Sequence, residues 1–393
     1  MKVYLDHAAT TPCDKRVVEA MLPYFTEDFG NADSQHGFGR ETAKAVAEAR
    51  ATVAKILNCA PNELYFTGSG TEADNWALKG VALNRREKGN HVIISAIEHH
   101  AVLTAAEWLS KQGFRVTKLP VDNKGRVSVA DLEQAIDDQT ILVSVMYANN
   151  EVGTLQPIKQ LAEVAHRHGA LFHSDCVQAI PYMKIDVKEL GLDIATISAH
   201  KFYGPKGVGA LYIRNGVKLD KLICGGGQER SQRGGTTDTP AVVGMAKALT
   251  LCQDELEQNN RHIAALRDHF VERVLAEIPY TRFNGDVEHR VPSVANFSFE
   301  FVEGEGILML MDFHGVAVSS GSACSSGSLD PSHVLLAMGV PIEISHGSIR
   351  FSFGKHNTME EVDYAVEALK DTINKLRAMS PLFNTKKGEE HNV

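Results

Sequence analysis

The segment Ser198-Ala199-His200-Lys201-Phe202-Tyr203-Gly204-Pro205-Lys206-Gly207 follows an apolar run that spans Asp193 to Ile197. A short run of this kind predicts a buried strand, and the glycines and proline after it predict a turn. Upstream, a second apolar run ends in His173-Ser174-Asp175. Lys201 and Asp175 therefore each stand at the carboxyl end of a predicted strand.

Lys201 and Asp175 are the pair of side chains that pyridoxal phosphate (PLP) requires. A lysine amine forms a Schiff base with the cofactor, and a carboxylate keeps the pyridine nitrogen protonated so that the ring accepts electrons. Taken alone, either residue is better interpreted as a solvated loop charge. Together with the motifs below, they predict a PLP site.

Short apolar runs alternate with helical periods from about Lys15 to Ile278. The runs are rich in Val and Ile and do not alternate strictly with polar residues, which is typical of strands buried on both faces. We therefore predict an α/β fold with a mostly parallel sheet between helices, and ligands at the carboxyl ends of its strands. The predicted strands include 91–94, 141–145, 170–173, 194–197 and 210–213, with a helix over 157–168.

The C-terminal part of the chain has a different pattern. Apolar residues from Leu249 to Val274 recur at helical spacing and predict one long helix that leaves the large domain. Strands near 294–298 and 348–351 and a helix near 306–313 predict a smaller α+β domain. A last amphipathic helix begins after Thr358, because Glu361 three residues on completes a capping box.

These patterns predict two domains and a tail. The large, PLP-binding domain spans residues 15–258. The small domain combines residues 1–14 and 259–380. Residues 381–393 are polar and charged, and we expect them to form a mobile tail.

The chain has 393 residues, a formal net charge of -9 and a pI near 6.0. This acidic balance argues against a general binder of nucleic acid or of anionic membranes. The first residues lack the apolar stretch of a signal peptide, and no run is long enough to span a membrane. The six cysteines are far apart, as in reduced cytosolic proteins. We expect a cytoplasmic protein with no nucleic-acid or membrane partner.

Two polar motifs are candidates for holding a cofactor. Gly68-Ser69-Gly70-Thr71 lies between a predicted strand and a predicted helix, so free N–H groups and the helix dipole favour a phosphate; a capped flexible turn is the alternative. His99 follows another strand, where an imidazole is placed to stack on a ring and to shuttle protons as a catalytic residue, or simply to begin a helix.

Other polar residues follow predicted strands and are candidates either for contact with a cofactor or for turns. Asn150 and Gln178 are candidates for contact with a ring oxygen, or are turn residues. Thr236 lies in a glycine-rich segment that is placed to reach a phosphate. His166 and His168 do not predict a metal site, because no convergent carboxylates or cysteines accompany them.

Two residues of the predicted small domain are candidates for chemistry on a substrate. Cys324 lies in a run of small polar residues, 319–328, where reactivity explains a thiol better than packing does. Arg350 lies within an apolar strand, and a buried arginine requires a carboxylate partner. That partner is either a structural Asp or Glu or the α-carboxylate of a substrate.

These motifs closely resemble the cysteine desulfurases of NifS/IscS type, which are fold-type-I PLP-dependent enzymes of the class-V aminotransferase family. The resemblance covers nearly the whole chain, beginning at Leu5-Asp6-His7-Ala8-Ala9-Thr10-Thr11-Pro12. Its most specific parts are 198–201 and 319–324. Cys176 departs from the usual alanine, either filling space or lying near the cofactor as an oxidisable thiol.

The resemblance implies a role for each candidate residue. Lys201 binds PLP covalently and removes the α-proton of the substrate, and Cys324 attacks the sulfur of L-cysteine, leaving L-alanine and an enzyme persulfide. Arg350, with Asn150, binds the substrate. The cofactor contacts are Asp175 at the ring nitrogen, His99 on the ring, Asn150 and Gln178 at the ring oxygen, and Gly70, Thr71, Ser198 and His200 at the phosphate, with Thr236 from the second subunit of a homodimer.

The resemblance also implies partners. Sulfur would pass to an iron–sulfur scaffold protein or another acceptor, with tRNA thiolation as a further destination. A selenocysteine lyase is a close alternative. An aminotransferase gives no reason for the Cys324 segment, and a non-enzymatic scaffold gives no reason for Lys201 and Asp175.

Overall fold

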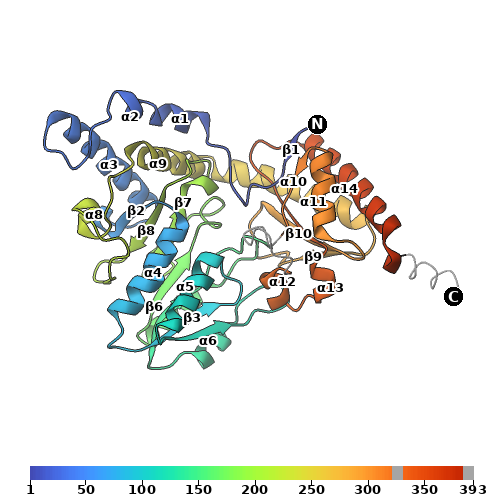
Figure 1. Ribbon diagram of the computed structural model, residues 1–393, viewed down its shortest axis with the longest axis horizontal. Coiled ribbons are helices and arrows are strands. Elements are labelled where there is room, and N and C mark those ends of the chain that lie inside the picture. Colours follow the sequence, from blue (N-terminus) through green and yellow to red (C-terminus); the bar gives the residue numbers. More distant parts are fainter. Residues whose placement is uncertain (321–330, 384–393) are drawn as a thin grey trace.

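The centre of the molecule is a seven-stranded sheet covered by helices on both faces (Figure 1). The computed structural model describes residues 1–320 and 331–383. Only β8 runs antiparallel to its two neighbours in this sheet. In spatial order the strands are β2 (Leu64–Thr67), β8 (Gly209–Ile213), β7 (Ile194–Ser198), β6 (Leu171–Asp175), β5 (Thr140–Ser144), β3 (His91–Ser95) and β4 (Arg115–Leu119).

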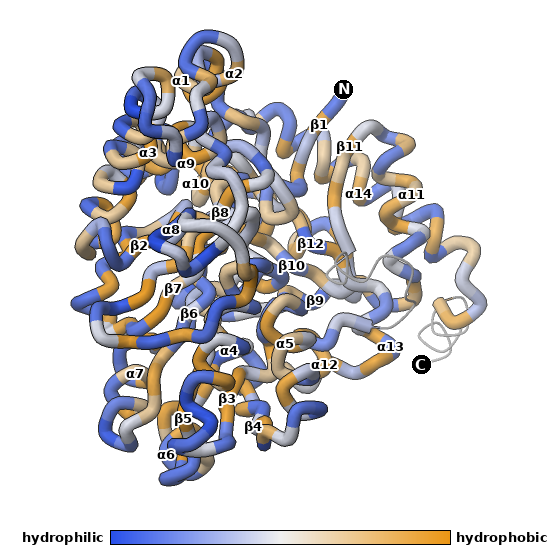
Figure 2. The backbone as a smooth tube through the Cα atoms, turned by 60° about the vertical axis from the view of Figure 1, so that its left-hand side comes forward, coloured by the Kyte–Doolittle hydropathy of each residue, from blue (hydrophilic) through white to orange (hydrophobic). Residues whose placement is uncertain are grey.

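The predicted buried strands are confirmed, because every residue of β3, β5, β6, β7 and β8 is buried. Figure 2 shows hydrophobic residues along these strands and hydrophilic ones on the turns and outer helices. The helices of this part are α1 (Lys15–Met21), α2 (Pro23–Thr26), α3 (Gly37–Ile56), α4 (Gly70–Asn84), α5 (His100–Lys111), α6 (Val129–Ala135), α7 (Ile158–Arg167), α8 (Gln228–Ser231) and α9 (Thr239–Asp254), with short 3₁₀ turns η1 (Pro61–Glu63) and η2 (Ala199–Lys201).

The sheet order brings the two cofactor candidates together. Strands β6 and β7 are parallel neighbours, and Asp175 at the end of β6 pairs with Thr196 in β7. Lys201 ends the 3₁₀ turn that follows β7. Because the carboxyl ends of parallel neighbours meet at one edge of the sheet, both residues lie at that edge.

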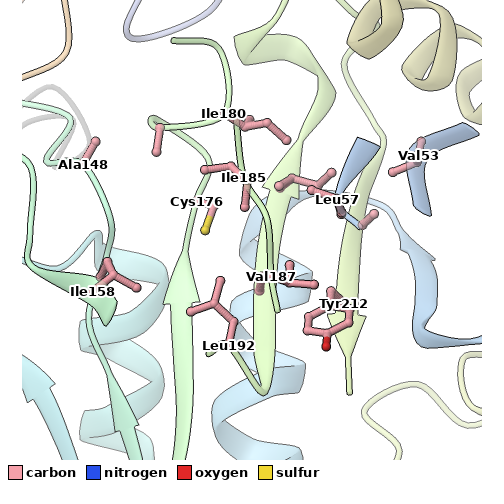
Figure 3. Close-up of a cluster of buried hydrophobic side chains, with 14 of the residues drawn as sticks. Val53, Leu57, Ala148, Ile158, Cys176, Ile180, Ile185, Val187, Leu192 and Tyr212 are labelled. Carbon is pink, nitrogen blue, oxygen red and sulfur yellow. The ribbon is translucent and has the colours of Figure 1, made fainter. Parts of the chain in front are cut away.

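Cys176 lies in the core beneath this edge and is fully buried (Figure 3). It packs among aliphatic side chains that include Ile180 and Ile185. Burial raises the pKa of its thiol far above the usual range. The space-filling interpretation of Cys176 is therefore the one that the structure supports.

A second hydrophobic core occupies the other end of the molecule (Figure 1). It lies between an antiparallel sheet of β12, β10 and β9 and the flanking helices. These elements are α10 (Leu256–Glu277), β9 (Thr281–Asn284), β10 (Val294–Phe299), α11 (Gly304–Phe313), β12 (Ser348–Ser352) and α14 (Met359–Met379), with β1 (Val3–Tyr4) paired to β11 (Val316–Ala317). Two short helices, α12 (His333–Ala337) and α13 (Ile342–Ser345), pack instead in a small separate cluster with Ile97 and Val152.

One predicted element is wrong: the long helix from Leu249 to Val274 is two helices. The backbone leaves the helical conformation at Glu255, which ends α9 and precedes α10. Both helices are amphipathic, so the apolar spacing continues across the break and conceals it. The capping box of Thr358 and Glu361 at the start of α14 is confirmed.

Val3 of the N-terminal strand β1 packs in the second core, and the large sheet has its own core; the predicted assignment of residues 1–14 to the small domain remains a prediction. The division at residue 258 remains a prediction. No helix within residues 1–320 and 331–383 is long and apolar enough to cross a membrane.

Candidate active site

A cavity of about 320 Å³ opens at the carboxyl ends of the central strands. This volume lies in the range of small-molecule sites. Ten of the predicted site residues line it: Gly70, Thr71, His99, Asn150, Asp175, Gln178, Ser198, His200, Lys201 and Arg350. Thr236 does not line it, and Cys324 lies outside the described residues.

Lys201 projects from η2 toward the N-terminal segment of the chain. Its Nζ donates hydrogen bonds to the carbonyl oxygens of Ala8 at 2.6 Å and Ala9 at 2.8 Å. The Gln178 side chain also donates to the Ala8 carbonyl, at 2.9 Å. The N-terminal segment therefore forms one wall of the cavity and aligns the lysine within it.

Asp175 is the last residue of β6, and it is only 5% exposed. Burial raises its pKa to about 6, although the backbone N–H of Val177 and the charge of Lys201 both act to lower it. The Val177 N–H donates to Oδ1 at 2.8 Å. Asp175 is thus a buried carboxylate that gains from a cationic or N–H partner in the cavity.

His99 caps the first turn of α5 and is held neutral. Its Nδ1 accepts a hydrogen bond from the Ala101 N–H at 3.1 Å, so the remaining ring proton lies on Nε2. Burial, and secondarily the charge of Lys201, lower its pKa to about 4. A neutral imidazole of fixed orientation is suited to lie against an aromatic ring.

The N-terminus of α4 provides an anion site in the same cavity. Ser69 caps the helix by accepting the Glu72 N–H at 3.1 Å, and Gly70 is the first helical residue. A Cβ atom at Gly70 would lie 3.2 Å from the Val177 side chain and 3.3 Å from the Ser198 Cβ atom. The glycine therefore keeps the backbone N–H groups close to β7, where a phosphate gains from them and from the helix dipole.

Arg350 enters the cavity from β12 of the second sheet and is 3% exposed. It donates from Nη1 to the Asn150 carbonyl at 3.0 Å and from Nη2 to Asp6 Oδ1 at 2.9 Å. Asp6 is therefore a structural carboxylate partner, which was one of the two predicted alternatives. Nε is buried, without a hydrogen-bond partner among the described residues.

Both flanks of the segment that contains Cys324 are attached at this cavity. Ser319 exchanges two backbone hydrogen bonds with Arg350, at 3.2 and 2.7 Å. On the other side, the Ser332 hydroxyl donates to Glu151 Oε2 at 2.5 Å, and His333 Nε2 lies 3.0 Å from the Glu98 carbonyl. The described residues on the two sides of 321–330 are thus held by Arg350 on one side and by Glu98 and Glu151 on the other.

Thr236 lies in a separate pocket of about 130 Å³, also lined by Gly68 and Arg233. Arg233 is paired with Glu72 at 2.8 Å, so this pocket borders the first turn of α4. Thr236 is not among the described residues that line the main cavity. The predicted contribution of Thr236 from a second subunit remains a prediction.

The residues of the main cavity fit PLP. An amine, a buried carboxylate, a flat neutral imidazole and the N-terminus of a helix match an aldehyde, a ring nitrogen, a ring face and a phosphate. The two histidines that were not expected to form a metal site contact carboxylates outside the cavity: His166 contacts Asp193, and His168 contacts Glu133. Within the described part of the chain, no group of three or more His, Cys, Asp or Glu residues is arranged to hold a metal ion.

The sequence interpretation missed Asp74, which lines the cavity beside Asp175 and is 1% exposed. The signal was available, because Asp74 lies among the buried residues Ala73 and Ala77 in α4. A carboxylate on the buried face of a helix is rare without a partner or a function.

The family was identified by comparison with known proteins. The family model described as aminotransferase class-V matches residues 3–365. The chain belongs to this family. Family members of the cysteine desulfurase type depend on PLP, so the predicted cofactor and fold class are confirmed.

Similar proteins place the chain within the cysteine desulfurase branch. It is 52% identical over 384 residues to the cysteine desulfurase IscS of Clostridium botulinum (strain Kyoto / Type A2), covering 97% of each chain. A solved structure titled NifS-like protein superposes with a TM-score of 0.90 at 39% identity, covering 95% of this chain and 100% of the other. The predicted resemblance to this branch is confirmed.

A third similar protein was solved with a ligand. The structure titled SspA in complex with cysteine has a TM-score of 0.81 at 34% identity and covers 91% of this chain and 100% of the other.

Proposed function

We propose that this protein is a PLP-dependent cysteine desulfurase that converts L-cysteine into L-alanine and takes the sulfur as a persulfide on Cys324. One observation carries the proposal. Lys201, Asp175 and Arg350 share one cavity, and the described residues that flank the Cys324 segment, Ser319 and Ser332, are bonded to Arg350 and to Glu151. A cavity with the cofactor groups alone would suit many PLP reactions.

The cofactor contacts follow from the chemistry of each side chain. Asp175 would keep the ring nitrogen protonated, His99 would pack on the ring, and Asn150 and Gln178 would hydrogen-bond the ring oxygen. The phosphate is held by Gly70, Thr71, Ser198 and His200, with Thr236 of a second subunit completing the site in a homodimer. When bound, PLP supplies the electron sink that lets the substrate α-carbon carry negative charge.

The remaining residues act on the substrate. Arg350 and Asn150 bind L-cysteine, with the guanidinium facing the α-carboxylate. The Lys201 amine accepts the α-proton, because it is held at the wall of the same cavity. The Cys324 sulfur forms a bond to the substrate sulfur while the bond between that sulfur and the substrate β-carbon breaks. The electron pair of the broken bond stays with the β-carbon, and protonation then gives L-alanine.

The sulfur destination is part of the proposal. A persulfide on a segment that borders the cavity can be passed to a second protein, and we propose an iron–sulfur scaffold protein or another sulfur acceptor. The names of the relatives support the desulfurase activity but do not identify this acceptor.

The test is alanine and persulfide formation from L-cysteine by the PLP-loaded protein. We expect Lys201→Ala to lose at least about 10²-fold in alanine formation, as expected for a missing general base. Cys324→Ser should lose both products, whereas Cys224→Ser, which removes an exposed thiol, should keep both. Full alanine formation by Cys324→Ser would reject the persulfide step.

A further inference from the structure

Asp74 is a buried carboxylic acid that the proposed reaction leaves without a role. It lines the cavity from α4, and its Oδ1 has no hydrogen-bond partner among the described residues. The nearest ring nitrogen is His173 Nε2, 3.6 Å from that oxygen. A carboxylate in such surroundings lacks the donors that would compensate for its desolvation.

Asp74 and Asp175 face the same cavity, so ionising both would place two like charges in one buried site. Such a pair titrates as a unit and retains one proton over a wide pH range. Burial and the charge of Asp175 raise the pKa of Asp74 well above its usual value, and Glu98 adds to this effect.

The two carboxyl groups differ in what stabilises their negative charge. Asp175 has the Val177 N–H and the charge of Lys201. For Asp74, only the Thr196 hydroxyl acts in that direction. The anion is therefore better stabilised on Asp175, and the proton is better placed on Asp74.

Among the described residues around Asp74, neither His173 nor Glu98 carries a charge that would balance an ionised Asp74. Burial lowers the pKa of His173 to about 3, so this ring is neutral. Its Nδ1 lies 2.8 Å from the Ser144 hydroxyl, and its Nε2 lies 3.1 Å from the Thr196 hydroxyl. The third acid, Glu98, is also kept neutral, because burial raises its pKa to about 8.

We propose that Asp74 is a positioning residue that remains protonated and confines the single negative charge of the pair to Asp175. This inference rests on the proposed function, since that charge is the one that would face the protonated ring nitrogen of PLP. The pocket then presents one negative charge to one positive charge. Asp74 acts through Asp175 and does not itself take part in the reaction.

The test uses the full chain, with infrared spectra and PLP affinity as separate measurements. At about pH 7.5, the difference spectrum of wild type minus Asp74→Asn should contain a protonated-carboxyl C=O band. The Glu98 band is common to both proteins and cancels. A matched control is Asp193→Asn, because Asp193 is a fully buried carboxylate outside the cavity that pairs with Arg214, and it should give no such band.

The affinity for PLP shows whether Asp74 acts by confining the negative charge to Asp175 or only by filling space. Asp74→Asn resembles the protonated acid and should bind PLP about threefold more weakly than wild type. Asp74→Leu has no hydrogen-bonding group and should bind about tenfold more weakly. Asp175→Asn, which removes the anion, should bind more than about tenfold more weakly.

Three results would overturn the inference. These are absence of the carboxyl band, equal affinities of the Asn and Leu variants of Asp74, or a loss in Asp74→Asn as large as that in Asp175→Asn. The infrared measurement is made without cofactor, so it stands if Asp74→Leu does not fold. If wild type binds no PLP, the proposed function fails, whereas the infrared result still decides the protonation of Asp74.

Discussion

Arg350 combines a structural role with a proposed binding role. Two of its nitrogens already donate, to Asn150 and to Asp6, while Nε is buried without a partner in the described part of the chain. Such a donor is costly unless a ligand meets it. The guanidinium is therefore pre-oriented by the protein, with donor capacity left for a carboxylate.

We predict that Arg350→Lys raises the KM for L-cysteine by about tenfold or more. A lysine is a point charge and cannot reproduce the planar, multi-donor contact of a guanidinium. Steady-state kinetics give the KM, and thermal unfolding of the same variant shows whether the fold is intact. An unchanged KM would remove Arg350 from the proposed substrate site.

At the scale of elements, the start of α4 decides the phosphate site. The helix has 15 residues, begins at the edge of the cavity, and is capped by Ser69. Its first residue is glycine, since β7 and the residues after β6 leave little room for a side chain. The N–H groups face the cavity only if the cap residue Ser69 and the first turn of α4 pack in this position against β7.

We predict that Gly70→Ala weakens PLP affinity about tenfold. The added methyl group would press on Val177 and Ser198, at 3.2 and 3.3 Å, and displace the N–H groups of the first turn. Gly37→Ala is the matched control, because Gly37 also begins a helix but its added Cβ would lie 3.8 Å from the nearest atom. Equal affinities of the two variants would contradict the prediction.

The short element α8 is held against the rest of the fold by a buried ion pair. Glu229 and Arg230 have positive φ angles of 45° and 56°, which non-glycine residues adopt only when their surroundings impose them. Glu229 accepts two hydrogen bonds from Arg50, at 2.7 and 2.8 Å, and one from the Phe66 N–H. These contacts fix the segment that leads to Thr236.

We predict that Glu229→Gln lowers the free energy of unfolding by about 3 kcal/mol, because it leaves the Arg50 charge buried without a counterion. The side chains of Glu229 and Arg50 are only 5% and 13% exposed. Glu133→Gln is the control. Its pair with Arg167 is solvent-exposed, and its loss should lower the free energy of unfolding far less than the loss of Glu229 does. Denaturant unfolding measures both, and similar values for the two variants would contradict the prediction.

At the scale of the whole molecule, the cavity lies where the two cores meet. Glu151 follows β5 of the large sheet, and its carboxylate accepts a hydrogen bond from Ser332, the residue that caps α12. Side chains of α12 pack on Ile97 and Val152 of the large sheet's loops. Glu151 therefore joins the two parts beside the segment that contains Cys324.

Burial raises the pKa of Glu151 from 4.5 to about 7. Between these values the folded protein holds a proton that the unfolded chain has lost. The stability that comes from this proton is complete below about pH 4.5 and is lost as the pH rises through 7.

We predict that the free energy of unfolding of wild type, relative to Glu151→Gln, falls by up to about 3 kcal/mol between pH 4.5 and 8. Glutamine stays neutral and keeps an acceptor for Ser332, so the variant lacks this pH dependence. Urea unfolding at several pH values measures the difference. A difference that is constant with pH would show that Glu151 does not titrate in this range.

The sequence by itself determined the strands and most of the site residues. The apolar runs before Asp175, Lys201 and Asn150 identify strand ends, and polar residues at strand ends are the expected ligands of an α/β fold. The break at Glu255 was missed because apolar spacing continues through it, and Asp74 was missed although its position among the apolar residues Ala73 and Ala77 places it on the buried face of α4.

Only the tertiary structure decided which of these residues share a cavity. Strand order joins Asp175 to Lys201, and the packing of the two cores brings Arg350 and both flanks of the Cys324 segment to the same edge, while Thr236 lies in a separate pocket. The tertiary structure also decided the protonation states of the site residues, because burial and neighbouring charges set their pKa values and neither follows from residue type alone. Local sequence thus specifies the chemical groups, and long-range packing specifies their distances and charges.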